Sequence, residues 1–91
     1  MYKLYFTGKF EKDLKLIEKR GYNVPLLEII IETLETTGKL DAKYLPHKLK
    51  GNYADCMECH IKPDWLLIWS QNDLSKEIYL MRTGTHSDLF K

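Results

Sequence analysis

The sequence lacks the features that mark membrane, secreted and disordered proteins. No segment approaches the length of a membrane span, and residues 1–6 alternate in polarity instead of forming the apolar run of a signal peptide. Its 2 cysteines are too few for a disulfide framework. Large apolar and aromatic side chains are plentiful, so disorder is not expected. We therefore expect a folded, cytoplasmic protein without membrane association.

Length and charge narrow the class further. A chain of 91 residues suits one compact domain, which we place at residues 1–91. The net charge is only +1, so overall charge does not point to nucleic acid. Lysines are concentrated in residues 1–20 and 39–50, and these two segments could form one phosphate-facing surface. Lysines are also the ordinary solvated face of a helix, so charge alone identifies no partner.

Apolar spacing predicts a strand and two helices in the first half of the chain. Residues 2–6 alternate as a strand, and a helix ending at Gly21 follows, with an apolar stripe at Phe10, Leu14 and Ile17. A second helix begins after Asn23, which can cap it, and ends at Gly38. Its wide apolar face consists of Leu26, Leu27, Ile30, Ile31 and Leu34, with Pro25 in the first turn.

The second half of the chain predicts a sheet. Residues 39–52 lose the helical period and are expected to form an ordered loop. Strands are expected at residues 53–61, 65–70 and 77–82. The turns between them are too short for crossover helices, so these strands should form an antiparallel meander. Helices grouped before the meander indicate an α+β domain with both helices packed on one sheet face.

One local motif, Cys56-Met57-Glu58-Cys59-His60, matches the C-x-x-C-H pattern of c-type haem attachment. That reading is disfavoured because the motif lies in a strand-like stretch and no export signal is visible. A zinc site is equally disfavoured, since no second ligand pair has suitable spacing. In a strand, Cys56 and Cys59 point to opposite faces, which predicts small core residues and neither metal nor cofactor.

All 3 histidines, His47, His60 and His86, lie in the C-terminal half. An isolated histidine usually has a surface or structural role, but three together suggest acid–base chemistry. Imidazole can take a proton from one oxygen and return it to another, as cleavage of RNA through its 2′-hydroxyl requires. Asp64 is suited to orienting a histidine or acting as a base, and Arg82 to holding a phosphate. This reading of the residues is plausible but not unique.

Three segments resemble the YafQ branch of the RelE superfamily, the bacterial toxins of type II toxin–antitoxin pairs that cleave mRNA on the ribosome. They are His47-Lys48-Leu49-Lys50-Gly51, the stretch from Cys59 to Ile68 with its His-x-x-Pro-Asp-Trp turn, and the terminus Arg82-Thr83-Gly84-Thr85-His86-Ser87-Asp88-Leu89-Phe90. The resemblance spans nearly the whole chain. It implies a RelE-like fold, a metal-free endoribonuclease and a cognate antitoxin as partner, with operator DNA bound only through the antitoxin complex.

Carried over residue by residue, the resemblance implies a site at the matching positions. His86 and Asp64 would transfer protons, His60 and His47 would assist or hold phosphate, and Arg82 would neutralise the scissile group. Phe90 would stack on a base, although a hydrophobic tether beside Leu89 is an equal alternative. The remaining expected RNA contacts are Lys48, Lys50 and Lys62. Trp65, at the start of a strand, is more simply a core residue.

Met57 departs from the family, because many relatives have an arginine three positions before the histidine that matches His60. One phosphate contact is therefore in doubt, and lysine is not an equivalent substitute for the arginine fork. Two functions stay open at this point. The first is an mRNA interferase that inhibits translation, and the second is a weak or inactive homologue that acts as an antitoxin-bound binding protein or co-repressor.

Overall fold

The computed structural model describes residues 1–90 and confirms the predicted α+β class. Among these residues, no helix is both long and apolar enough to cross a membrane. The elements follow the chain in this order: β1 (Lys3–Phe6), α1 (Gly8–Lys19), α2 (Val24–Thr37), the 3-10 turn η1 (Ala42–Tyr44), β2 (His47–Lys48), the 3-10 turn η2 (Gly51–Tyr53), β3 (Cys56–Lys62), β4 (Trp65–Asn72), β5 (Glu77–Gly84) and α3 (His86–Leu89).

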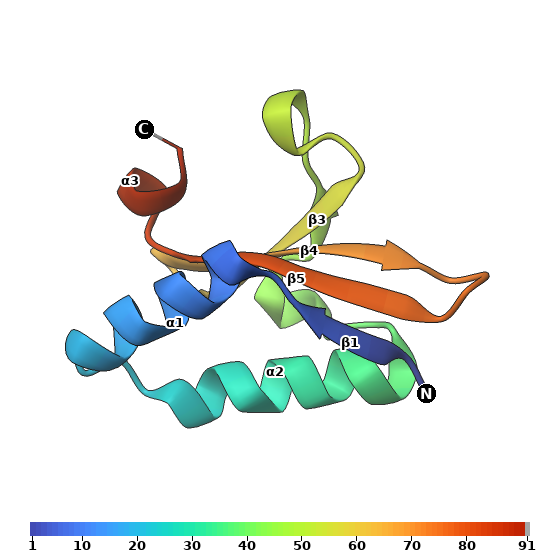
Figure 1. Ribbon diagram of the computed structural model, residues 1–91, viewed down its shortest axis with the longest axis horizontal. Helices are drawn as coiled ribbons and strands as arrows, with labels where there is room; N and C mark the ends of the chain where they lie inside the picture. Colours follow the sequence, from blue (N-terminus) through green and yellow to red (C-terminus); the bar gives the residue numbers. More distant parts are fainter. Residues whose placement is uncertain (91) are drawn as a thin grey trace.

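The strands form one mixed sheet of five, in the order β1-β5-β4-β3-β2. The predicted antiparallel meander is present as β3, β4 and β5. β1 pairs in parallel with β5, so the start of the chain lies beside its last strand (Figure 1). The short strand β2 pairs antiparallel with β3 and forms the opposite edge of the sheet.

Local signals set the bounds of the two long helices. The Thr7 side chain caps α1 by accepting a hydrogen bond from the Phe10 backbone at 3.1 Å. α2 has Pro25 in its first turn and ends at Gly38, whose φ of 71° is left-handed. A Cβ at Gly38 would lie 2.5 Å from the Tyr2 hydroxyl, so glycine is required there. Asn23 precedes α2 as predicted, but its side chain makes no capping hydrogen bond.

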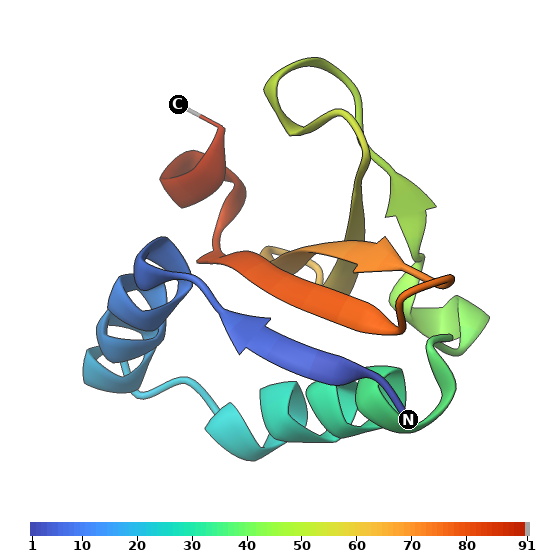
Figure 2. The same cartoon turned by 45° about the vertical axis from the view of Figure 1, so that its right-hand side comes forward.

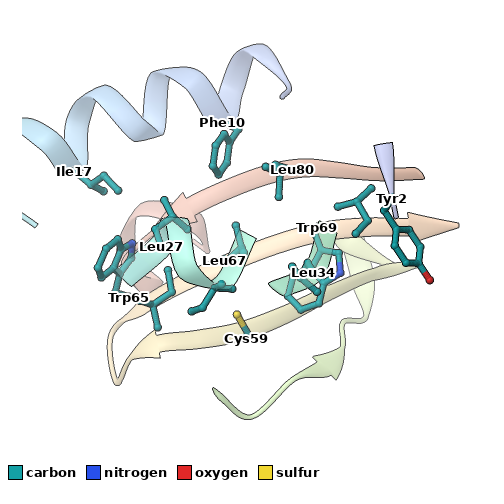
Figure 3. Packing of buried hydrophobic residues seen from close by; sticks show 13 residues of the cluster. Tyr2, Phe10, Ile17, Leu27, Leu34, Cys59, Trp65, Leu67, Trp69 and Leu80 are labelled. Atoms are coloured by element: carbon teal, nitrogen blue, oxygen red, sulfur yellow. The ribbon is translucent and has the colours of Figure 1, made fainter. Parts of the chain in front are cut away.

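Both long helices cover one face of the sheet, as predicted (Figures 1 and 2). Phe10 and Ile17 of α1 and Leu27 and Leu34 of α2 are buried in one cluster with Leu67 of the central strand β4 (Figure 3). Cys59, Trp65, Trp69 and Leu80 belong to the same cluster. Burial of these side chains is the main source of stability in so small a chain.

The opposite face of the sheet has a smaller apolar cluster, and this is the face that matters for the site. Its buried members are Cys56, Leu66, Ile68 and Leu89. Alternation along β3 and β4 separates these residues from the helix-side core. α3 and the loop containing η2 lie on this second side of the sheet (Figures 1 and 2).

Two segments differ from the sequence prediction. Residues 39–52 were expected as a loop, yet they contain η1, β2 and part of η2, so β3 begins at Cys56 and not at residue 53. Residues 86–89 were not expected to be helical but form α3. These short elements span too few residues for a repeating pattern to be visible in the sequence. Contacts with distant parts of the chain stabilise them.

Candidate active site

His86 and Asp64 form one close pair at the start of α3. Thr85 caps this short helix and so fixes the direction of His86. Oδ1 of Asp64 accepts hydrogen bonds from the His86 backbone N–H at 2.9 Å and from Nδ1 at 2.5 Å. The backbone N–H, followed by the Nδ1 contact, holds the pKa of the Asp64 carboxyl below its ordinary value. With Nδ1 donating to Asp64, Nε2 of His86 faces away with its lone pair available.

A second group is built by β2 and β3. His47 donates from Nδ1 to the Leu45 carbonyl at 2.8 Å, and its Nε2 lies 3.1 Å from Oε1 of Glu58. The His60 ring donates from Nδ1 to the Pro63 carbonyl at 3.3 Å, and its Nε2 lies 3.9 Å from the same Glu58 oxygen. Glu58 is buried, and its Oε2 has no hydrogen-bond partner within residues 1–90. The Glu58 carboxyl therefore lies between the two imidazoles and links β2 to β3 at this point.

The three imidazoles form a continuous row. Ring centroids of His47 and His60 are 6.2 Å apart, and those of His60 and His86 are 5.8 Å apart. The sequence separates these histidines by many residues, so the sheet and α3 create the row. Groups at this spacing can act on the two oxygens of one phosphodiester.

Arg82 lies in the same part of the sheet. His47 pairs with Glu58, Glu58 with Ile68 and Ile68 with Arg82, so one register line crosses four strands. The guanidinium of Arg82 donates from Nε and Nη2 to Asp13 of α1 at 2.6 and 3.1 Å. These bonds raise the pKa of Arg82 above its ordinary value, so the group stays charged.

Phe90 is half-exposed, and its ring meets the Tyr53 ring edge-on at 5.8 Å. The Tyr53 hydroxyl accepts a hydrogen bond from Nη1 of Arg82 at 3.4 Å. Leu89, next to Phe90, is buried in the second apolar cluster. Leu89 therefore acts as the hydrophobic tether, and the exposed face of Phe90 remains accessible for stacking.

The three candidate lysines lie in two different parts of the surface. Lys62 borders the same surface hollow as His60 and Pro63. Lys48 and Lys50 line a different hollow, together with Met57, at the edge formed by β2. Met57 packs against the helix-side cluster, so an arginine at position 57 would also project away from the histidine row. The substitution at Met57 therefore does not remove a charge from the row itself.

The basic segments at residues 1–20 and 39–50 do not lie together. α1 packs against β5, toward one edge of the sheet, whereas residues 39–50 lead into β2 at the other edge (Figure 2). The expected shared phosphate-facing surface is not formed.

The cysteines behave as the strand alternation predicts. Cys56 and Cys59 are free, buried and in different apolar clusters. Burial raises the pKa of the Cys59 thiol to about 12, so it remains protonated and unreactive at neutral pH. Trp65 is buried as predicted, with its Nε1 donating to Thr83 at 3.0 Å.

Sequence reasoning missed Asp13, Tyr53 and Glu58. Strand alternation places Glu58 on the same face as His60, so this residue had a detectable signal. Asp13 and Tyr53 had none, because each lies far along the chain from Arg82 and in an ordinary sequence context.

Comparison with known proteins gives consistent matches. Residues 2–91 match the model of the family described as bacterial toxin of type II toxin–antitoxin system, YafQ. The mRNA interferase toxin YafQ of Escherichia coli K12 is 36% identical over 86 residues, covering 93% of this chain and 91% of that protein. In the crystal structure of the E. coli DinJ–YafQ complex, the matching chain is 34% identical with a TM-score of 0.90, and both chains are fully covered (100%).

A metal-bound toxin from Helicobacter pylori is 40% identical with a TM-score of 0.89, covering 99% of this chain and 100% of that one. In the part of this chain that the structure describes, no group of three or more His, Cys, Asp or Glu side chains is arranged to hold a metal ion.

Proposed function

The chain belongs to the YafQ family of bacterial toxins of type II toxin–antitoxin systems, and from that membership we propose that it is an mRNA interferase, an endoribonuclease that inhibits translation by cutting messages. The observation that supports this most strongly is the row of His47, His60 and His86, in which Asp64 holds His86, while Arg82 lies on the same register line of the sheet as Glu58. We also propose that residues 1–91 act as one toxin domain, since the family match covers residues 2–91.

The proposed reaction uses the RNA's own 2′-hydroxyl as the nucleophile. A base removes its proton, the oxygen attacks the adjacent phosphorus, and an acid protonates the departing 5′-oxygen. The products are a 2′,3′-cyclic phosphate, or the 3′-phosphate formed from it, and a 5′-hydroxyl end. Every proton in this scheme moves between an oxygen and a nitrogen of the histidine row.

His86 is the residue best suited to one of the two proton transfers. Its Nδ1 is held by Asp64, which leaves Nε2 directed outward, and more than half of its side chain is exposed (53%). The sequence assigned proton transfer to Asp64 as well, but its lowered pKa keeps the carboxylate ionised, so we propose that it orients this ring and stabilises the protonated form during the reaction.

His60 and His47 serve the other side of the phosphodiester. Their Nε2 atoms lie 3.1 Å (His47) and 3.9 Å (His60) from Oε1 of the buried Glu58, which holds both rings on the same face of the sheet. A protonated imidazole can protonate the leaving oxygen or hold the phosphate, and the row leaves the choice between these two histidines open. Arg82, fully charged, neutralises the charge that develops on the phosphoryl oxygens.

Binding of RNA is assigned to groups around the row. Phe90 offers an exposed ring face on which a base can stack. Lys62, which borders the same hollow as His60, is placed to contact the RNA backbone. Lys48 and Lys50 lie farther round the β2 edge and are assigned to neighbouring phosphates or to the surface that presents the message.

Two macromolecular partners follow from family membership. The E. coli YafQ protein has been crystallised with DinJ, and we propose that this chain likewise binds a cognate antitoxin protein, which silences it. We propose that the message is cut on the ribosome, because a chain with a net charge of +1 has little general attraction for free RNA. Operator DNA would be bound only through the antitoxin complex, and the site of action would be the cytoplasm.

The test is induced expression in bacteria, with growth recorded and mRNA 5′ ends mapped. We expect the parent chain to arrest growth and generate new internal ends, and His86→Ala to abolish both. Ser87→Ala, which alters the exposed neighbour of His86 in α3, is the matched control and should behave as the parent.

If parent and His86→Ala cultures grow alike with intact messages although the protein is soluble, cleavage is the wrong function. The chain would then be an inactive homologue that acts as an antitoxin-bound binding protein. Co-purification with the antitoxin and operator binding by the complex would identify that role.

A further inference from the structure

Arg82 is held from one side by a carboxylate that belongs to neither the histidine row nor the family motifs. Asp13, in the middle of α1, is only 9% exposed, and 69 residues separate it from Arg82. The contact is two-pronged, with Nε at 2.6 Å and Nη2 at 3.1 Å from the two carboxylate oxygens. Two parallel hydrogen bonds of this kind fix the plane of the guanidinium as well as its position.

The same carboxylate also ties down the strand. Its Oδ2 accepts a hydrogen bond from the Thr83 backbone N–H at 3.1 Å. Asp13 therefore holds both the side chain of Arg82 and the backbone of the next residue, so the guanidinium has little freedom to swing. A charge that must meet a transition state gains most from such restriction.

The direction of the contact decides which part of Arg82 faces RNA. A guanidinium has a side edge, Nε with one Nη, and an end edge formed by both Nη groups. Asp13 occupies the side edge, and Nη1, the nitrogen outside that edge, donates to the Tyr53 hydroxyl at 3.4 Å. Tyr53 in turn contacts Phe90. Nη1 of Arg82 is therefore linked through Tyr53 to the assigned base-stacking ring.

We infer that Asp13 is a positioning residue of the proposed ribonuclease, which turns the end edge of Arg82 toward the scissile phosphate. The inference rests on the proposed function for its catalytic consequence. The contact itself is testable without any catalysis.

The first experiment measures cleavage of mRNA on translating ribosomes by purified variants. Asp13→Asn keeps an acceptor for the Thr83 N–H but loses the charge and one acceptor for Arg82. We expect kcat to fall about 10- to 100-fold with KM changed little, because the aimed charge acts in the transition state. Glu11→Gln removes one negative charge from an exposed position of the same helix and should leave cleavage within about twofold of the parent.

A double-variant comparison separates positioning from a structural role. If Asp13 acts through Arg82, adding Asp13→Asn to Arg82→Ala should change the remaining cleavage by less than about twofold. Equal losses in both backgrounds, or parent-like cleavage by Asp13→Asn, would overturn the inference. If Asp13→Asn does not fold, Arg82→Lys takes its place. Lysine is a point charge and cannot bind Asp13 and a phosphate through two separate edges. Cleavage as fast as the parent's would therefore also overturn the inference.

A second readout is independent of activity. The Nε–H of Arg82 should give a slowly exchanging NMR signal in the parent that is lost or shifted in Asp13→Asn, while most backbone signals stay in place. A parent chain that shows this dependence but cuts no mRNA would refute the proposed function and leave the contact intact. An Arg82 signal indifferent to Asp13→Asn would refute the positioning role.

Discussion

Oδ1 of Asp64 accepts both the backbone N–H and the Nδ1–H of His86, so a single carboxylate oxygen fixes the position and the tautomer of the ring. In this arrangement Nε2 is always the nitrogen that faces solvent and substrate. The pair is largely exposed, and surface ion pairs contribute little to stability. The pair therefore matters mainly because it orients the His86 ring.

Asp64→Asn should therefore impair cleavage without unfolding the chain. The Oδ1 of asparagine can still accept both hydrogen bonds, but the negative charge that stabilises the protonated ring is lost. We expect mRNA cleavage to fall by about 10²-fold or more while the thermal unfolding midpoint changes little. Parent-like cleavage would mean that His86 needs no negative charge beside it.

The acid titration of Asp64 offers a direct check of the same contact. Its pKa is lowered in the folded chain because the ionised form accepts both hydrogen bonds. Stability from this group is present above the ordinary carboxyl pKa of about 3.9 and is lost as pH falls through the lowered value. Carbon-detected NMR of the carboxyl should report that lowered pKa.

In His86→Ala the pKa of Asp64 should rise only part of the way, since the backbone N–H, the larger cause, remains. A titration at or above the ordinary value in the parent would contradict the pairing. A complete return in His86→Ala would mean that the side chain, not the backbone, dominates.

Asp88 is expected to keep the short helix α3 folded. It accepts two hydrogen bonds from Arg20, at 2.6 and 3.1 Å, and completes the capping box with Thr85. The Arg20 contact holds the pKa of Asp88 well below its ordinary range. Asp88→Asn should loosen α3, speed amide exchange at residues 86–89 and lower cleavage several-fold, because His86 begins this helix.

Global stability should change by about 1 kcal/mol or less in Asp88→Asn, since a cap and an outer ion pair are lost but no core contact. Asp41→Asn is the matched control, because Asp41 caps η1 in another part of the chain. Unchanged exchange at residues 86–89 in Asp88→Asn would show that Leu89 alone holds α3.

A truncation at the centre of the sheet should lower the free energy of unfolding more than the other substitutions. Leu67 in β4 is completely buried (0% exposed), and truncation to alanine should cost about 2–5 kcal/mol in the free energy of unfolding. Leu74→Ala, at a side chain 98% exposed in the β4–β5 turn, should stay within about 0.5 kcal/mol of the parent. Urea denaturation of both variants measures the difference, and equal midpoints would place the core elsewhere.

Much of the fold could be predicted because its main elements have regular periods. Phe10, Ile17, Leu27 and Leu34 recur at helical spacing, and all are buried between helices and sheet. Alternation in β3 correctly separated Cys56 from Cys59. The pairing of β1 with β5 was not predicted, because parallel pairing between strands so distant in sequence leaves no local pattern.

The candidate site shows the same contrast between residues that local patterns reveal and residues that only long-range contacts bring in. Residues within the family motifs, such as Asp64 and His86, are found in contact. Glu58 was overlooked, although alternation places it on the same face of β3 as His60 and charged residues are rarely buried without a partner. The pairing of Asp13 with Arg82 depends on how α1 lies across the end of β5, which no local signal in the sequence specifies.

The parallel pairing of β1 with β5 also has a consequence for synthesis. β1 and α1 leave the ribosome first, but the strand and the arginine that they contact are translated some 70 residues later. The nascent chain can therefore form neither the parallel pairing of β1 with β5 nor the Asp13–Arg82 contact while most of it is being made. A protein whose proposed target is the translating ribosome thus acquires its working shape after its own translation is nearly finished.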